Sequence, residues 1–483
     1  MEFFGHIIDG HEVESLDGAR MDTVDPYTQE AWAEVAMGTQ KDADLAVTAA
    51  RTAFDSGPWP RMGYERRQFV MDRLADLMEE HADELALADT RDMGKPVVQS
   101  RHDVARSVWN VRFFADHARL SAADAYPMDS GHHAYSRFDP AGVVVAISPW
   151  NFPLMMSTWK VAPALAWGNT VVLKPAEDTP VSATILGRLA LEAGIPPGVL
   201  NVVHGYGPES VGSALTSNPD IDRITFTGES GTGRIISAAA ARNLVPVSLE
   251  LGGKGANIVF DDADLDNAVH WAIEAIFRNA GQVCLAGSRL YVQRGSYDEF
   301  VRRYKVAAEA LVMGDPKDPA TQFSPALASH EHYTKVSGFL DQASLGGGRI
   351  VTGGLFTGEA SAGWGVLPTI ITDAPADARV VKEEIFGPVV VATPFDTEAE
   401  AVALANDTRY GLNAMVFTEN LSRAHRVSAQ LRAGTVWVNC FFIRDLRAPF
   451  GGVGDSGVGR EGGNFSREFF TEPKAVVMQI TPT

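Results

Sequence analysis

A cysteine in a glycine-bounded run is the first candidate for chemistry in this chain. Cys284, one of two cysteines, lies in the run GQVCLAG (281–287). Small residues beside a thiol let a substrate and backbone N–H groups approach it closely. Glu250 stands in a second glycine-rich run, ELGGK (250–254). A carboxylate near the thiol can activate water against whatever the sulfur has captured, so this pairing predicts covalent catalysis through a thioester.

Two further motifs directly follow short β-branched runs and should therefore lie at strand ends. PWNFP (149–153) supplies Asn151, whose amide NH₂ can donate to a developing oxyanion; taken alone, the motif fits an ordinary turn asparagine better. KPAE (174–177) follows a strand-like run, and ligands of open α/β sheets bind beyond the carboxyl ends of strands. Lys174 and Glu177 can hold two ribose hydroxyls of an adenosine, whereas a solvated ion pair explains them equally well.

Glycine-rich segments raise the question of phosphate binding. FTGESGTG (226–233) lies between a strand-like and a helical run, which suits a phosphate at a helix N-terminus; a plain glycine turn is the alternative. Arg234-Ile235 stands where a P-loop needs Lys-Ser/Thr, which disfavours a nucleoside triphosphatase. The tail 451–463 matches G-x-G-x-x-G, but no strand directly precedes the match and no long helix follows it. We interpret it as a chance match.

The second thiol and the histidines give weaker signals. Cys440 ends the apolar run TVWVNC (435–440), so we expect a buried, inert thiol. The twelve histidines show no metal-ligand spacing, and no metal site is predicted.

The elements that must position these residues alternate between strand-like and helical patterns from residue 141 onward. Before that point, apolar residues at three- and four-residue steps predict helices over most of 41–120, with Gly94 ending one of them. The turn-rich segment 124–139 predicts an extended hairpin. The β–α alternation beyond it predicts a doubly wound parallel sheet, and a second such series starts at ANIVF (256–260). We therefore expect two α/β domains.

Composition narrows the class of protein. The 483 residues are 45% hydrophobic with a formal net charge of −20, and no basic run stands out. Nucleic acid and anionic membranes are therefore poor partners. The N-terminus has no signal-peptide pattern, and no stretch approaches the ~20 apolar residues that span a bilayer. Two cysteines cannot form a disulfide framework, so the cytoplasm is the expected compartment.

Taken together, the motifs resemble the aldehyde dehydrogenase superfamily over almost the whole chain and in the family's order. The motifs that carry the resemblance are PWNFP (149–153), KPAE (174–177), FTGESGTG (226–233), ELGGK (250–254), GQVC (281–284), EEIFGP (383–388), and PFGG with GVGRE (449–461).

The resemblance implies an α/β fold with a Rossmann-type NAD-binding domain, an α/β catalytic domain and a small β oligomerisation flap. On this chain the expected NAD-binding domain is 1–122 with 141–251, and the catalytic domain is 252–450. The oligomerisation segments are 123–140 and 465–483. Such a flap implies a homo-dimer or homo-tetramer.

The same resemblance assigns catalytic roles. Cys284 is the expected nucleophile, and Asn151 forms the oxyanion hole with the Cys284 backbone N–H. Glu250 is the expected general base that activates water, and Glu461 the secondary proton relay. A glutamate at position 250 favours hydrolysis over transfer to coenzyme A. The implied reaction is NAD-dependent oxidation of a small aldehyde to a carboxylic acid.

The implied cofactor is NAD. Lys174 and Glu177 are expected at the adenine ribose, Glu384 at the nicotinamide ribose and Phe386 near the nicotinamide. A carboxylate at position 177 accepts hydrogen bonds from the ribose hydroxyls and repels a 2′-phosphate, which favours NAD over NADP. The motifs supply the remaining expected contacts: Trp150, Thr227, Gly228, Gly233, Leu251 and Gly252.

The run NCFFIRDLRAPFGG (439–452) is similar to the 2-hydroxymuconic and 2-aminomuconic semialdehyde dehydrogenases. The substrates of that group are short semialdehydes that bear a carboxylate. Arg444 is therefore expected to clamp a carboxylate, with Arg106 as a second arginine. The candidate pocket walls are Phe152, Trp159 and Phe450.

Simpler interpretations stay open at this point. Arg444 and Arg447 can bond Asp445, and Arg106 can lie on a plain helix face. The enzyme can also be a broad aliphatic or aromatic aldehyde dehydrogenase without preference for an anion. A non-catalytic structural member of the fold is a third alternative, which the joint presence of Cys284, Glu250 and Asn151 disfavours.

Overall fold

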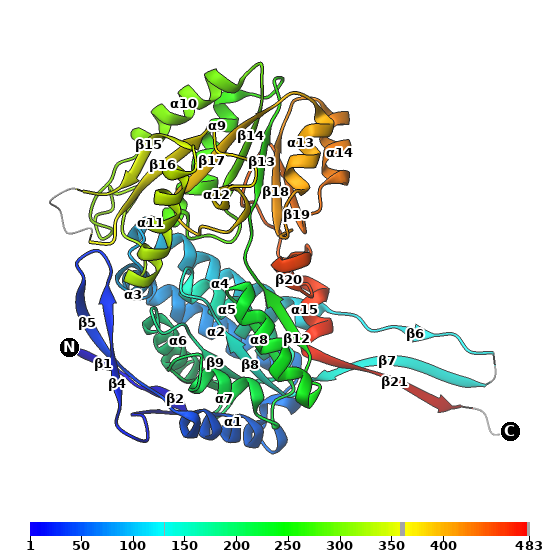
Figure 1. Ribbon diagram of the computed structural model, residues 1–483. Coiled ribbons are helices and arrows are strands. Elements are labelled where there is room, and N and C mark those ends of the chain that lie inside the picture. Colours follow the sequence, from blue (N-terminus) through cyan, green and yellow to red (C-terminus); the bar gives the residue numbers. More distant parts are fainter. Residues whose placement is uncertain (130, 358–362, 481–483) are drawn as a thin grey trace.

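Two sheets form the cores of two units, which lie one above the other in Figure 1. The structure, a computed structural model, describes residues 1–129, 131–357 and 363–480. The lower unit contains the N-terminal half of the chain, and the upper unit contains residues from β13 to β19. No helix in the described ranges combines the length and the apolar character that crossing a membrane requires.

The lower unit is built on an eight-stranded sheet with the order β20-β12-β11-β8-β9-β10-β2-β3. Its five central strands are parallel and buried, as expected for a sheet covered on both faces. The parallel strands are β8 (Val143–Ile147), β9 (Thr170–Lys174), β10 (Leu200–Val202), β11 (Arg223–Thr227) and β12 (Val247–Glu250), and the antiparallel ones are β2 (His6–Ile8), β3 (His11–Val13) and β20 (Gly457–Val458).

Helices cover this sheet on both faces, and the residues of β8 alternate between them. Val143 and Val145 pack with α1 (Gln40–Asp55), α7 (Val211–Ser217) and α8 (Ser230–Ala240). Val144 and Ala146 belong to the opposite core, to which the other helices of the unit contribute: α2 (Tyr64–Glu80), α3 (Ala82–Met93), α4 (Val97–Leu120), α5 (Pro153–Ala166) and α6 (Val181–Glu192). The predicted helices in 41–120 are present, and α3 ends at Gly94 in the left-handed conformation (φ 77°).

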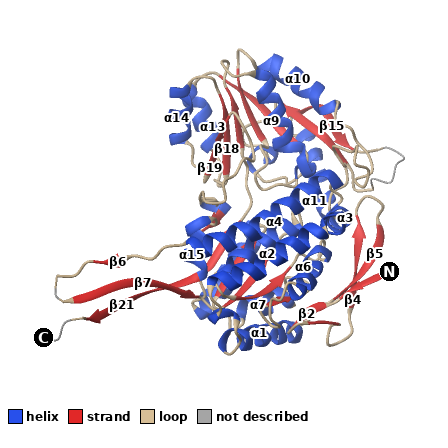
Figure 2. Cartoon of the chain, turned by 180° about the vertical axis from the view of Figure 1, so that it is seen from behind, coloured by secondary structure: helices blue, strands red, loops and turns tan. Residues whose placement is uncertain are grey.

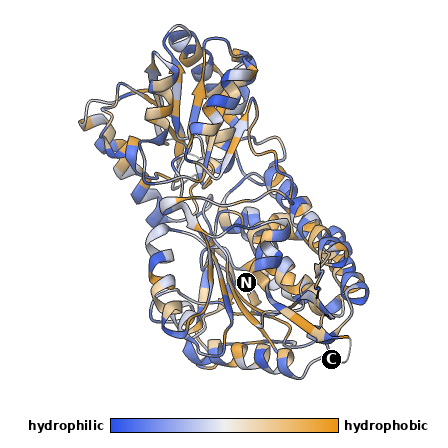
Figure 3. Cartoon of the chain, turned by 90° about the vertical axis from the view of Figure 1, so that its right-hand side faces the viewer, coloured by the Kyte–Doolittle hydropathy of each residue, from blue (hydrophilic) through white to orange (hydrophobic). Residues whose placement is uncertain are grey.

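The upper unit is built on a seven-stranded sheet with the order β15-β16-β17-β14-β13-β18-β19, parallel except for the edge strand β15. The strands are β13 (Ala256–Val259), β14 (Arg289–Gln293), β15 (Arg349–Leu355), β16 (Val366–Thr372), β17 (Val389–Phe395), β18 (Asn413–Phe417) and β19 (Thr435–Val438). One face packs on α9 (Leu265–Phe277), α10 (Tyr297–Glu309) and α11 (His330–Leu345), and the other on α13 (Glu398–Asn406) and α14 (Leu421–Gln430). The short α12 spans Arg379–Lys382. In Figure 3 hydrophobic strands lie inside this unit, and its outer helices carry hydrophilic faces.

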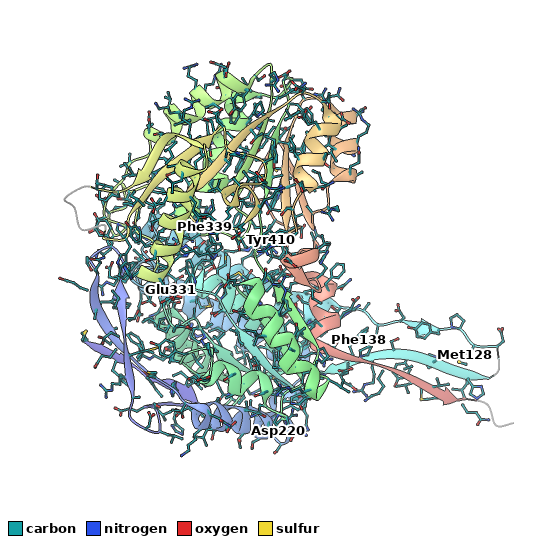
Figure 4. All side chains as sticks on the ribbon, in the orientation of Figure 1. Met128, Phe138, Asp220, Glu331, Phe339 and Tyr410 are labelled. Atoms are coloured by element: carbon teal, nitrogen blue, oxygen red, sulfur yellow. The ribbon has the colours of Figure 1, made fainter. Side chains whose placement is uncertain are left out.

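A three-stranded arm projects from the lower unit (Figures 1 and 2). It consists of β6 (Ala125–Tyr126), β7 (His132–Pro140) and β21 (Thr471–Gln479) in the order β21-β7-β6. Figure 4 shows Phe138 near the root of the arm and Met128 near its tip. The expected oligomerisation segment 465–483 begins within α15 (Gly463–Phe470), whose buried residues pack against the lower unit, and continues as β21. Ser130 and residues 481–483 of the expected oligomerisation segments lie outside the described residues.

The sequence patterns did not reveal a three-stranded sheet at the N-terminus. It contains β1 (Glu2–Phe4), β4 (Arg20–Asp25) and β5 (Glu30–Ala36) in the order β1-β5-β4. Short 3₁₀ turns complete the described elements: η1 (Trp59–Arg61), η2 (Ala241–Asn243), η3 (Arg278–Gly281) and η4 (Gly454–Ser456).

Candidate active site

The predicted site residues gather where the two units meet. β8, β9, β11 and β12 are parallel, so the segments that follow them emerge at one edge of the lower sheet. The segments that precede β13, β14 and β17 lie against this edge, and hydrogen bonds join the two sides. Each unit therefore contributes residues to one site.

Asn151 is held against the loop that carries Cys284. It follows β8 and is buried, and its Nδ2 donates to the Gln282 carbonyl at 2.8 Å. Gln282 precedes Cys284 by two residues, so this bond fixes the amide beside the thiol-bearing loop. The structure thus brings Asn151 and the Cys284 loop together.

Cys284 is half-buried and free of any disulfide. Burial raises the pKa of its thiol to about 12, and the negative charges of Glu384 and Glu250 raise it further, whereas the Arg444 cation opposes them. These residues are therefore close enough to Cys284 to act on its charge. At neutral pH the group is therefore a protonated thiol.

Glu250 ends β12, and neither of its carboxylate oxygens has a hydrogen-bond partner among the described residues. Burial raises the pKa of this carboxyl well above its usual range, and the charge of Glu461 raises it further. Gly252 and Gly253, which follow Glu250 closely, bring the chain near the loops of Glu384 and Cys284. A Cβ on Gly253 would lie 2.4 Å from the Cys284 carbonyl oxygen, so a side chain at this position would separate the two segments.

Glu461 lies in a buried polar cluster that is close enough to Glu250 to raise the pKa of that carboxyl. It accepts hydrogen bonds from the Trp159 indole, from Lys160 Nζ at 3.3 Å and from Thr225 Oγ1 at 3.2 Å. Lys160 also donates to Thr225 Oγ1 at 2.9 Å. This arrangement places a carboxylate and a lysine next to the candidate base.

Glu384 reaches the segment that follows Glu250. Its Oε1 accepts from the Gly253 N–H at 2.8 Å, and a Cβ on Gly252 would lie 2.1 Å from its Oε2. Burial raises the pKa of Glu384 to about 7, although the bond from Gly253 opposes the shift. The carboxylate therefore keeps acceptor capacity for a hydroxyl group.

Phe386 belongs to an aromatic cluster on the same loop. Trp150 meets its ring edge to face, with centroids 5.2 Å apart, and His332 of α11 is 4.9 Å from Trp150. The His332 Nε2–H donates to the Phe386 carbonyl at 2.7 Å, and burial lowers the pKa of this histidine to about 4. The cluster fixes the loop that presents Glu384.

Lys174 and Glu177 lie after β9 and bond each other at 3.2 Å. The ion pair of the alternative interpretation is present, but it is not solvated at the lysine, because Lys174 is buried and Glu177 is partly exposed. Binding of ribose hydroxyls by these two residues stays a prediction.

The neighbouring positions fit a dinucleotide. Thr227 ends β11, and its Oγ1 is buried without a hydrogen-bond partner among the described residues. Gly228 follows it before α8, and Gly233 in α8 packs against Leu251. The buried hydroxyl, the open helix N-terminus and the acceptor oxygens of Glu384 together suit the hydroxyls and phosphates of NAD.

Arg444 lies on aromatic rings instead of pairing with Asp445. Its guanidinium carbon is 3.7 Å from the Phe450 ring centroid and 4.7 Å from that of Trp159. No hydrogen bond or ion pair joins Arg444 to a carboxylate of the described residues, and its Nη2 is buried without a partner. Burial and the charge of Arg106 lower the pKa of Arg444 to about 9. Arg447 is the residue that bonds Asp445.

Arg106 lies on α4 and is half-buried. Its guanidinium lies 4.5 Å from the ring centroid of Trp109, and its Nε donates to Asn110 at 3.3 Å. Burial lowers the pKa of Arg106 to about 10. The positive charges of Arg106 and Arg444 thus lie within electrostatic reach of each other.

Phe152 and Phe450 are both buried, Phe450 against Arg444, and the structure adds residues that the sequence patterns missed. Phe442 stacks on Phe152 with centroids 6.4 Å apart, and Arg278 lies over Phe442 at 5.3 Å. Phe442 stands in the run that carries Arg444, and Arg278 lies just before GQVC. Their positions beside these motifs were the only feature of the sequence that could have indicated them as site residues.

The second thiol and possible metal ligands remain to be placed. Cys440 is half-buried, so the expectation of a buried thiol is wrong, and partial burial raises the pKa of Cys440. Within the described ranges, no group of three or more metal-ligating side chains is present.

Comparisons with known proteins agree with this geometry. Residues 13–476 match the aldehyde dehydrogenase family. The chain belongs to the aldehyde dehydrogenase family. It is 47% identical to a 2-hydroxymuconic semialdehyde dehydrogenase of Pseudomonas sp. (strain CF600), over 99% of this chain and 100% of that protein. It is 44% identical to a 2-aminomuconic 6-semialdehyde dehydrogenase of Pseudomonas sp., over 99% of both.

Among solved structures, the NAD⁺ complex of an aldehyde dehydrogenase from Bacillus cereus superposes with a TM-score of 0.96. The two are 41% identical, and the match covers 99% of this chain and 97% of that one. The predicted aldehyde dehydrogenase fold and enzyme class are thereby confirmed.

Proposed function

We propose that this aldehyde dehydrogenase oxidises a carboxylate-bearing semialdehyde to the corresponding diacid through a cysteine thioester. The observation that carries the proposal is the contact of Asn151 with the loop of Cys284, beside the carboxyl group of Glu250. An amide donor, a thiol and a base are the groups that acyl chemistry on sulfur requires.

The cofactor is NAD, in agreement with the NAD⁺ complex of the B. cereus relative. We expect Glu384 and the Lys174–Glu177 pair to hold its riboses, Phe386 and Trp150 to lie by the nicotinamide, and Thr227 with the α8 N-terminus to meet the phosphates. When bound, NAD supplies the acceptor for the hydride that leaves the aldehyde carbon.

The residues of the chain supply the covalent steps. The Cys284 thiol gives its proton to water, and the thiolate attacks the aldehyde carbon. Asn151 Nδ2 and the Cys284 N–H donate to the resulting alkoxide. Loss of hydride from that carbon leaves an acyl thioester. Glu250 then takes a proton from water, and the hydroxide attacks the thioester carbon. The products are the carboxylic acid and the Cys284 thiolate.

The electrostatics of the site suit these proton transfers. The pKa of Glu250 is raised by burial, which brings it closer to the range in which a general base works at neutral pH. Glu461 and Lys160 lie behind Glu250 in a hydrogen-bonded cluster. We propose that this cluster passes the proton from Glu250 onward.

The two arginines support a substrate that bears a carboxylate in addition to its aldehyde group. Burial and the charge of Arg106 lower the pKa of Arg444, and its unpartnered Nη2 can donate to an anion. The Arg444 cation also opposes the rise in the pKa of Cys284, which supports a position close to the thiol. A muconic semialdehyde, the substrate class named for two relatives, has a carboxylate and an aldehyde in one short molecule.

Arg444→Ala tests this choice of substrate. We expect kcat/KM for a semialdehyde acid to fall by about 100-fold, since a charged hydrogen bond contributes about 1.5–3 kcal/mol. A neutral aldehyde of similar length should lose much less. Arg447→Ala is the matched control, because Arg447 is exposed on the same loop and bonds Asp445. Equal losses on both aldehydes would instead support a broad-specificity enzyme.

The arm supports a homo-oligomer. β21 and β6 form its edges, and Val477, Met478 and Tyr126 are exposed on it. Unpaired strand edges with exposed apolar side chains favour association with another copy. We propose a homo-dimer or homo-tetramer built through this arm, and the cytoplasm as the compartment.

A further inference from the structure

Asn279 lies in a strained turn between α9 and the nucleophile. The backbone of Asn279 has φ 52° and ψ 33°, and that of Ala280 has φ 51° and ψ 36°. A residue other than glycine has a steric cost in this left-handed region, least so for asparagine. Two such residues stand in succession just before Cys284.

The Asn279 side chain joins the two units at the site. It is 1% exposed, and its Nδ2 donates to the Asn151 carbonyl at 2.9 Å and to the Gln282 carbonyl at 3.4 Å. The Asn279 backbone N–H donates to Gln99 Oε1 at 2.9 Å. One amide group therefore bonds both the loop after β8 and the loop before β14.

These contacts determine how the Asn151 amide points. An amide NH₂ has two hydrogens, and one of those on Asn151 is donated to the Gln282 carbonyl at 2.8 Å. That bond turns Nδ2 toward the nucleophile loop and leaves one N–H for a developing oxyanion. Asn279 holds the backbone of the same residue, so the Asn151 side chain starts from a fixed position.

A buried ion pair adds a second support to the same carbonyl. Lys95 Nζ lies 3.4 Å from the Asn151 oxygen and 2.8 Å from Asp103 Oδ2. The side chains of Lys95 and Asp103 are 0% and 3% exposed. The Asn151 carbonyl thus accepts from two buried donors, of which Asn279 is the nearer.

We propose that Asn279 is a positioning residue for the oxidation step, which it serves by aligning the Asn151 donor with Cys284. This inference rests on the proposed function, in which Asn151 donates to the alkoxide formed on Cys284. Asn279 itself touches no reacting atom, so its removal should slow the chemistry without removing any catalytic group.

Asn279→Gly removes the amide and keeps the turn, because glycine adopts positive φ without strain. We expect kcat to fall about tenfold or more, since small misplacements of reacting groups have effects of this size. The pre-steady-state burst of NADH should slow, and an aldehyde deuterated at the reacting carbon should show a primary isotope effect. The KM for NAD and the melting temperature should stay near those of the parent enzyme.

Ala280→Gly is the matched control, because it makes the same backbone change at the next residue without touching the amide. It should keep the parent kcat, and an equal loss in Ala280→Gly would overturn the inference. Asn279→Asp, which keeps the size and removes the donor, should lose activity like Asn279→Gly. Full turnover in either Asn279 variant would also overturn it.

Asn151→Ala, assayed in parallel, separates this inference from the function on which it rests. Loss of turnover in Asn151→Ala, with full turnover in Asn279→Gly, rejects only the positioning role. Full turnover in Asn151→Ala rejects the proposed oxyanion role itself.

Discussion

The two sheets contribute opposite edges to the site. The lower sheet presents the carboxyl ends of its parallel strands, where Asn151, Lys174, Thr227 and Glu250 follow or end β8, β9, β11 and β12. The upper sheet presents segments that precede its strands, with Cys284 before β14 and the 383–388 loop before β17. The general rule for ligand sites in open α/β sheets describes the first edge and not the second.

The two edges therefore make different contributions. The carboxyl edge of the lower sheet provides strand ends and a helix N-terminus suited to a dinucleotide, together with Asn151 and Glu250, the proposed oxyanion donor and base. The amino edge of the upper sheet provides Cys284, the proposed nucleophile, and the loop of Glu384 and Phe386, which are expected at the nicotinamide end of NAD. Substitutions at the proposed catalytic residues and at the expected cofactor residues should therefore affect different steps.

Cys284→Ala is expected to have the largest effect. Without the thiol no thioester forms, and we expect turnover to fall by about 10⁴-fold or more, as for other nucleophile deletions. Calorimetric titration should show that NAD still binds, because the residues expected to hold it lie elsewhere. Loss of NAD binding together with turnover would contradict the separation of Cys284 from the residues expected to hold the cofactor.

Lys160→Met should destabilise the protein by about 3–5 kcal/mol, because it leaves the buried Glu461 carboxylate without its cation. Urea denaturation followed by fluorescence measures this loss. The double variant Lys160→Met/Glu461→Gln should regain much of it, since the uncompensated charge is gone. A stable single variant would contradict the buried ion pair.

Glu250→Gln should reduce steady-state turnover by about 10²–10³-fold while it preserves an NADH burst, because it removes the base of the hydrolysis step. In the parent enzyme, hydrolysis should slow as the pH falls through the pKa of Glu250, since only the ionised carboxylate accepts a proton. That pKa is raised, so the loss should begin above the ordinary carboxyl range. A burst lost together with turnover would place Glu250 in the first step.

Glu177→Gln should have the smallest effect. It removes a carboxylate that repels a 2′-phosphate and accepts from the ribose hydroxyls, so the preference for NAD over NADP should shrink by about tenfold. The ratio of kcat/KM values for the two cofactors measures it. An unchanged ratio would show that the carboxyl edge does not select the cofactor at this position.

The sequence was sufficient for the repeating parts of the fold. Buried β-branched strands and amphipathic helices have local periods, and Gly94 marks the end of α3. The N-terminal sheet was missed because β1 is three residues long and pairs with β5. Residues 463–470 were not predicted as a helix, because the element is short and its packing partners lie far away in the sequence.

For the site as well, local patterns predicted some residues, and long-range contacts determined others. Motifs revealed Cys284, Glu250 and Asn151, whose chemical types stand out in glycine- or proline-bounded runs. They did not reveal Lys160, whose partner Glu461 is 301 positions away, or Asn279, which acts through the Asn151 carbonyl. The first contact forms within the lower unit between distant parts of the sequence, and the second depends on how the two units dock. A local pattern contains no information about either.

The chain leaves the lower sheet at Glu250 and enters the upper sheet at Ala256. A protein cut between these strands would therefore divide the catalytic centre as well as the polypeptide. Expressed separately, each fragment would carry only part of the machinery, and reassembly of the pair would be needed to restore turnover.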